Sequence, residues 1–177
     1  MGLYIVICIL IVLFAIFFTI YVINCNRFQS LIIKINEAEE NIGSLLREKQ
    51  NLLLLINESL GKKESDDLLN TITNINVNEL NNFELNSSLS KFDSRIVELR
   101  DFERDIELTE EQLKMFDDLE NINVDCLASE KYYNDNVNLY NKLLETFPSS
   151  VVAKLKRFKH KEIYSNEKEE IFEILKK

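Results

Sequence analysis

The side chains that could transfer protons or bind a metal ion are few in this sequence, and they are not paired as such chemistry requires. Acidic clusters occur at Glu37 to Glu40 and at Glu110-Glu111, and paired carboxylates suit glycoside or metal chemistry. A di-iron site in a helical bundle, however, needs Glu-x-x-His motifs from two helices. His160 is the one histidine and stands among lysines, so we expect it to be solvated. The carboxylates are therefore interpreted as polar helix faces.

Other chemical motifs are absent from the sequence. It contains no glycine-rich phosphate loop, no Cys-x-x-Cys pair and no nucleophile elbow. The three cysteines, Cys8, Cys25 and Cys126, have spacings that fit neither a disulfide framework nor a metal site. Cys126 falls at an apolar helix position, where we expect a buried thiol. The sequence therefore predicts no catalytic residue, no metal and no cofactor, and the protein is expected not to be an enzyme.

Two Tyr-Asn pairs are the best candidates for a specific role. Tyr133-Asn134 and Tyr140-Asn141 are separated by a seven-residue step, which places both pairs on one face of a helix. One interpretation is a patch that binds a protein partner. The other, which we favour, is that the tyrosine rings pack between helices with the asparagines at the flank.

A basic stretch near the C-terminus is the second candidate surface. Its cations are Lys154, Lys156, Arg157, Lys159 and Lys161. An even number of antiparallel helices returns the chain to the side that it left, so this stretch would lie near a membrane from which the first helix emerges. Cations there would contact anionic lipid headgroups. An ordinary solvated charge run is the alternative.

The element that would position this stretch is the N-terminus, where residues 1–23 contain no charged side chain. A helix of about 20 apolar residues covers roughly 30 Å, enough to cross a hydrocarbon core. The run is too long and lacks the basic start of a cleaved signal peptide. We therefore expect residues 1–24 to be a single-pass anchor in the cell membrane. Arg27 and Lys34 follow the span and no lysine or arginine precedes it, which predicts an outside N-terminus and a cytoplasmic body.

The composition of the body predicts an all-α fold. The chain has three glycines and one proline, too few for the frequent turns of a barrel or sandwich. Its net charge is −9, which repels phosphate backbones, so no nucleic-acid partner is expected. One folded domain beside the anchor is the expectation for 177 residues.

Apolar residues at helical spacing divide the body into four helices. The first runs from Phe28 to Leu60, with an apolar stripe that includes Ile42, Leu45, Leu52 and Ile56. Lys49 interrupts the stripe, and its head is expected at the rim. The second starts near Ser65, and the third carries the seam from Leu85 to Phe102. The fourth starts at the capping box of Thr109 to Gln112, carries a stripe that ends at Phe147, and stops at Pro148.

These segments predict a transmembrane helix followed by an antiparallel, up-and-down four-helix bundle whose first and last helices are long. The predicted domains are the anchor at 1–24, the bundle at 25–148 and a basic then acidic tail at 149–177. A short helix is expected in the tail from Asn166. No strong break separates the anchor from the first helix of the bundle, so the two are expected to be continuous.

Several of these residues resemble the LemA family. The matching segments are Arg27 to Leu31, Asn36 to Glu39 with Leu52-Leu53, Leu119-Glu120, Tyr133 to Asn141, Phe147-Pro148-Ser149, Ala153, Phe158 and Tyr164. The middle, about 62–110, is too diverged to align with the family. Val124-Asp125-Cys126 stands where the family often has Asn-Arg-Ile, and a proline common late in the first helix is missing. The resemblance implies one anchor and an antiparallel helical bundle, and little about function.

Two functions remain open from the sequence. The first is a non-enzymatic, membrane-anchored bundle that acts as a scaffold or interaction protein, contacting the lipid bilayer and an unknown protein partner. The alternative is a bitopic coiled-coil subunit of a cell-envelope or division complex, in which the heptads pair between chains. The second interpretation implies a homo-oligomer, so the oligomeric state separates the two.

Overall fold

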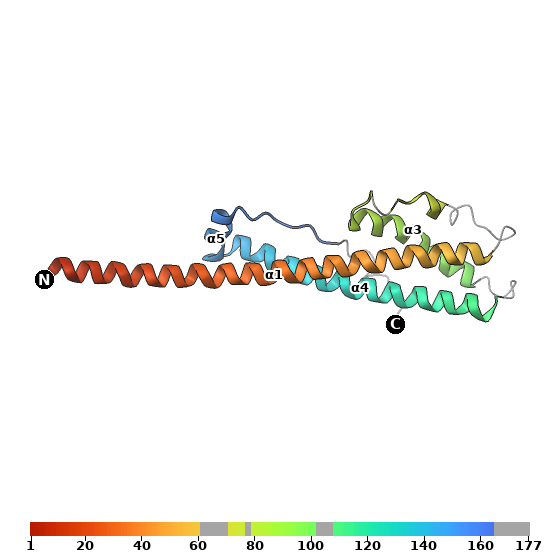
Figure 1. The fold of residues 1–177 in the computed structure, drawn as a ribbon, viewed down its shortest axis with the longest axis horizontal. Helices are drawn as coiled ribbons and strands as arrows, with labels where there is room; N and C mark the ends of the chain where they lie inside the picture. Colours follow the sequence, from red (N-terminus) through yellow and green to blue (C-terminus); the bar gives the residue numbers. More distant parts are fainter. Residues whose placement is uncertain (61–70, 77–78, 102–107, 165–177) are drawn as a thin grey trace. The chain divides into compact units, whose positions relative to one another are not determined.

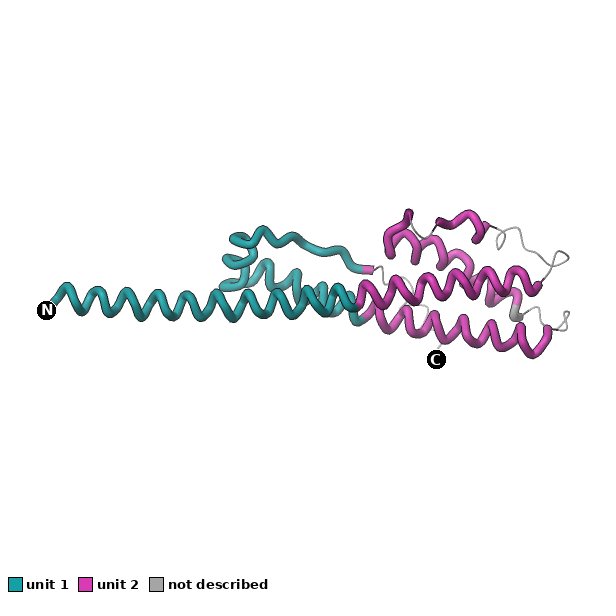
Figure 2. Tube along the Cα trace, in the orientation of Figure 1, with its two compact units in different colours: residues 1–37, 132–163 teal, residues 38–131, 164–177 magenta. Residues whose placement is uncertain are grey.

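A computed structural model of the chain describes residues 1–60, 71–76, 79–101 and 108–164 (Figure 1). Within these ranges the protein is all-helical and contains no strand, as predicted. The elements are α1 (Gly2–Leu60), the 3-10 helix η1 (Thr71–Asn74), α3 (Asn82–Asp101), α4 (Glu110–Glu145) and α5 (Ser149–Lys156). They form two compact units (Figure 2).

Unit 1 comprises residues 1–37 and 132–163, and unit 2 comprises residues 38–131 and 164–177. Both long helices therefore contribute to both units. The units do not coincide with the domains expected from the sequence, because they divide α1 at Glu37 and α4 after Lys131.

The predicted continuity of the anchor with the first body helix is confirmed, because α1 is a single helix of 59 residues. No proline interrupts it, and its glycines are tolerated within a helix that has many strong helix formers. By length and composition it is the one described helix that could cross a membrane. Every side chain from Met1 to Thr19 is exposed, so this apolar stretch has no partner within the described part of the chain.

In unit 2, α1, α3 and α4 pack around a common apolar core. The α1 stripe is buried at Ile42 and Ile56, as predicted, and at Leu46 and Leu53, one position beyond the predicted Leu45 and Leu52 respectively. The other core positions are Leu85, Leu89, Phe92 and Ile96 on α3 and Phe116, Leu119, Ile122 and Cys126 on α4. The predicted burial of Cys126 is confirmed. Burying a side chain of this size stabilises a fold by about 1.5–3 kcal/mol.

The hydrogen bonds between these helices give their directions. Asn41 donates to Ser129 at 2.8 Å, and Gln112 donates to the Ser59 carbonyl at 2.9 Å, so α1 and α4 are antiparallel. Hydrogen bonds also join Glu39 to Asn82 and Lys49 to Asp93. From the first pair to the second, the residue numbers increase in both helices. Consequently α3 runs parallel to α1.

The predicted second helix is not found over the residues that the structure describes. The start of that prediction, at Ser65, lies outside the described residues, and the next described element is the short η1 with Ile72 buried. Gln50 donates to the Ile75 carbonyl at 2.9 Å. This bond holds the segment before α3 against α1. The described part of unit 2 thus has three α-helices and the 3-10 helix η1, so the four-helix arrangement is not confirmed.

The start of α4 is confirmed in detail. The Gln112 side chain accepts from the Thr109 backbone N–H at 2.9 Å, and the Gln112 N–H donates to Thr109 Oγ1 at 3.2 Å. These two bonds are the capping box predicted from the sequence.

The end of α4 differs from the prediction. The helix stops at Glu145, and Phe147, expected in the apolar stripe, is 78% exposed. The Ser149 hydroxyl lies 2.7 Å from both the Leu143 and the Thr146 carbonyl oxygens. Leu143 lies in the last turn of α4, whose carbonyl groups lack partners within the helix, and the Thr146 carbonyl also accepts from the Ser150 N–H at 2.8 Å. Ser149 thus helps to close the turn from α4 into α5.

Unit 1 has a small aromatic core where α1, α4 and the chain after α5 meet. The Phe28 ring contacts the Tyr140 ring edge-on at a centroid distance of 5.6 Å and the Phe158 ring at 5.0 Å. Val152 and Ala153 of α5 are buried. The short helix predicted from Asn166 lies outside the described residues.

Candidate docking groove and membrane-proximal surface

The two Tyr-Asn pairs lie on the buried side of α4. Tyr133 and Tyr140 are each 3% exposed, and burial raises the pKa of the Tyr140 hydroxyl above its usual value. Asn134 is at the limit of burial, at 9% exposed. Rings placed in this way contact other parts of the same chain.

Asn141 connects α4 to the C-terminal part of unit 1. Its amide Nδ2 donates to the Lys161 carbonyl at 2.9 Å, and its Oδ1 accepts from the Lys161 backbone N–H at 3.0 Å. This two-bond pairing holds an extended backbone against the helix. The seven-residue spacing indicated a shared face but not this partner, which comes from 20 residues further along the chain.

The basic stretch begins inside α5 and continues beyond it. Lys154, Lys156, Arg157 and Lys159 are exposed, and Lys161 is half-buried. Arg157 adopts the left-handed conformation that ends a helix (φ 56°), and the Phe158 N–H donates to the Ala153 carbonyl at 3.0 Å. The helix end therefore fixes where the cations lie.

The residues considered for catalysis are not assembled into a site. His160 is 60% exposed, and its Nε2 lies 3.8 Å from Glu145 Oε1. Glu37, Glu40, Glu110 and Glu111 are exposed, and Glu39 is half-buried. Within the described residues no group of three His, Cys, Asp or Glu side chains could hold a metal ion.

A buried polar network in unit 2 was not anticipated from the sequence. The Lys49 head was expected at the rim, but the side chain is 1% exposed and its Nζ lies 2.5 Å from Asp93 Oδ1. Asn123 of α4 also donates to this carboxylate, at 3.4 Å. Nearby on the same helices, Asn86 donates to the buried Glu130 at 2.8 Å. The single lysine in the α1 stripe was the sequence feature that could have indicated this network. A charged side chain at an apolar position needs a polar partner when it is buried.

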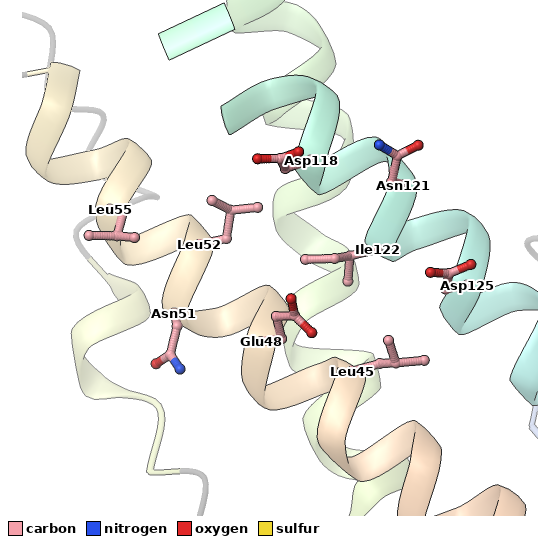
Figure 3. Close-up of a pocket in the computed structure, with 9 residues that line it drawn as sticks. All are labelled: Leu45, Glu48, Asn51, Leu52, Leu55, Asp118, Asn121, Ile122 and Asp125. Atoms are coloured by element: carbon pink, nitrogen blue, oxygen red, sulfur yellow. The ribbon is translucent and has the colours of Figure 1, made fainter. Parts of the chain in front are cut away.

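A groove between α1 and α4 in unit 2 has a volume of about 520 Å³ (Figure 3). From α1 it is lined by Leu45, Glu48, Asn51, Leu52 and Leu55, and from α4 by Asp118, Asn121, Ile122 and Asp125. Figure 3 shows Ile122 extending from α4 toward α1. Leu55 is 50% exposed, so the groove is open to solvent.

The lining combines an apolar base with an acidic rim. The positions Leu45, Glu48, Leu52 and Leu55 follow each other at steps of three and four, the spacing with which one helix packs on another. The charged members, Glu48, Asp118 and Asp125, are all exposed carboxylates, and the lining contains no lysine or arginine. In peptide recognition generally, an apolar groove of this kind accommodates the apolar face of an amphipathic helix.

The fold and these surfaces define a class: an all-helical protein whose first helix is compatible with a single-pass membrane anchor. The model of the LemA family matches residues 62–174, which is more than half of the chain. The chain therefore belongs to the LemA family, as its sequence resemblance indicated. The match includes the diverged segment 62–110, and it starts after the first helix. No match was found among curated proteins or among solved structures.

Proposed function

We propose that this protein is a non-enzymatic, single-pass membrane protein whose helical body binds a protein partner at the cell membrane. The observation that carries the proposal is the open groove between α1 and α4 in unit 2. It presents leucine side chains at helix-packing spacing on a helix that begins as an apolar, exposed span.

The chemistry of the groove selects one kind of partner. Leu52 and Ile122 at the base favour an apolar helix stripe, while Asp118 and Asp125 at the rim favour cations at its edges. We therefore propose that the partner is an amphipathic helix with leucine-sized anchors flanked by lysine or arginine. Complementary charge increases the association rate and excludes acidic helices.

Synthetic helices can test this proposal on the full chain in a non-ionic detergent, which removes anionic lipid as a competing surface. The probes are two fluorescent peptides with the same leucine pattern, one carrying lysine and the other glutamate at the flanking positions. Fluorescence anisotropy should show binding of the lysine peptide and at least about tenfold weaker binding of the glutamate peptide. Asp118→Lys with Asp125→Lys should reverse this preference.

Asp135→Lys with Glu145→Lys is the matched control, because both residues are exposed on α4 outside the groove and the net charge changes equally. This control should keep the preference for the lysine peptide. Equal binding of both peptides, or a loss of preference in the control, would overturn the groove as the docking site.

The alternative is a subunit whose heptads pair between chains. In the described part of unit 2 the apolar stripes of α1, α3 and α4 are already buried within one chain, which supports the first proposal. We expect light scattering of the detergent-solubilised chain to give the mass of one copy. A stable dimer that no longer binds the lysine peptide would instead assign the groove to a second copy.

A further inference from the structure

Helix α5 has an outward face that carries apolar side chains. Ser149, Val152 and Ala153 are buried, and the helical repeat places Val151 and Leu155 on the opposite side, one turn apart. Val151 is 49% exposed and Leu155 is 69% exposed, and Phe147, directly before the helix, is 78% exposed. Two apolar side chains on the outward face of α5 and one directly before the helix are thus exposed.

Contacts inside unit 1 fix this face beside the end of the apolar span. Phe158, which follows α5 directly, contacts Phe28 of α1 at a centroid distance of 5.0 Å. The fully exposed stretch of α1 ends shortly before Phe28, because Ile20 and Tyr21 are half-buried and Asn24 is 5% exposed. Figure 2 shows α5 in the same unit as the N-terminal part of α1, which continues beyond it. If the span lies in hydrocarbon, α5 lies at the headgroup level.

Cations lie within α5 and at its end. Lys154 and Lys156 are in the helix, Arg157 ends it, and all three are exposed. Apolar side chains that enter the boundary of the acyl chains, with cations at the headgroups, are the composition of a segment that lies on a membrane surface.

We propose that Phe147, Val151 and Leu155 insert into the lipid interface, and that Lys154, Lys156 and Arg157 bind the headgroups of anionic lipids. This second membrane contact would hold unit 1 against the bilayer. The proposal rests on the span assigned to α1 under the proposed function, and it concerns a surface different from the groove.

The absence of tryptophan from the chain allows a direct test with single-tryptophan proteins in nanodiscs. The full chain carrying Leu155→Trp is compared in phosphatidylcholine and in a phosphatidylcholine–phosphatidylglycerol mixture, each with a lipid spin-labelled near the headgroup as quencher. We expect blue-shifted emission, and quenching at least about twofold stronger in the anionic mixture. Lys154→Glu, Lys156→Glu and Arg157→Glu together should remove the difference between the two lipids.

Three controls separate the possible results. Val97→Trp, exposed on α3 in unit 2, should be less quenched than Leu155→Trp. Arg47→Glu, Lys91→Glu and Lys114→Glu make the same net charge change at exposed positions in unit 2 and should leave the quenching unchanged. Val12→Trp reports the span through a spin label deep in the acyl chains, so its failure would overturn the anchor itself.

Two results would overturn the α5 contact while leaving the anchor intact. One is Leu155→Trp quenched no more than Val97→Trp, while Val12→Trp is quenched by the deep label. The other is anionic-lipid quenching that survives the triple charge reversal, because the cations would then contribute nothing.

Discussion

Lys49 is the residue at which the body departs furthest from a simple apolar seam. An ammonium group at 1% exposure is strongly disfavoured unless a counter-ion and hydrogen bonds replace its water. Asp93 supplies the counter-ion from α3, and Asn123 adds a donor to the same carboxylate from α4. The network joins three helices at one level, so it specifies their register as well as satisfying the charge.

The network predicts an asymmetric response to mutation. Asp93→Ala should destabilise the protein by about 3 kcal/mol, because it removes the carboxylate beside a buried ammonium. Adding Lys49→Met to that protein should restore most of the loss, since a methionine fills similar volume without a charge. Chemical denaturation followed by circular dichroism measures each change.

The exposed pair on the same helix is the control for this prediction. Arg95 Nη1 and Glu98 Oε2 lie 2.6 Å apart, and both side chains are partly exposed. Glu98→Ala should change the free energy of unfolding by less than about 1 kcal/mol. If Asp93→Ala were no worse than Glu98→Ala, the buried network would have no role in stability.

At the scale of the elements, local signals were predicted well because their causes are local. The capping box of Thr109 and Gln112 depends on four consecutive residues, and the continuity of α1 follows from the lack of a breaker. The exact α1 seam could not be predicted, because the run from Leu52 to Leu55 offers apolar side chains on every side. Packing against α3 and α4 selects Leu53.

Elements that depend on distant contacts were not predicted. The return toward α3 is held by Gln50 on the Ile75 carbonyl, a tertiary bond that periodicity does not reveal. Phe147 continued the apolar pattern of α4 in the sequence, yet the helix ends at Glu145 and the ring is exposed. The Ser149 hydroxyl, which lies 2.7 Å from the Leu143 and Thr146 carbonyl oxygens, belongs to a turn that no periodic pattern describes.

For the candidate surfaces too, the sequence revealed the one that is local and not the one that depends on tertiary packing. The basic stretch was visible in the sequence because it is contiguous, and its lipid contact stays a proposal. The groove was not visible, because it depends on which flank of α1 the other helices leave uncovered. Leu45 and Leu52 were predicted to be core and instead line that groove, so a helical stripe alone does not tell a seam from a docking surface.

At the scale of the whole molecule, the distribution of cations is the basis for a proposed orientation in the membrane. No lysine or arginine precedes the span, and Arg27 and Lys34 follow it. The structure adds Lys154, Lys156 and Arg157 to the same compact unit as the span. Cations favour the cytoplasmic, anionic leaflet, so we propose that the body lies in the cytoplasm and the N-terminus outside.

Labelling of introduced cysteines tests this orientation in spheroplasts of an expression host. In a background with Cys8, Cys25 and Cys126 changed to alanine, Gly2→Cys marks the N-terminus and Lys91→Cys marks an exposed position of the body. A membrane-impermeant maleimide should label only Gly2→Cys in intact spheroplasts and both proteins after detergent is added. The reverse pattern would place the body outside, where α5 would meet a less anionic leaflet and the electrostatic part of its lipid contact would lose its basis.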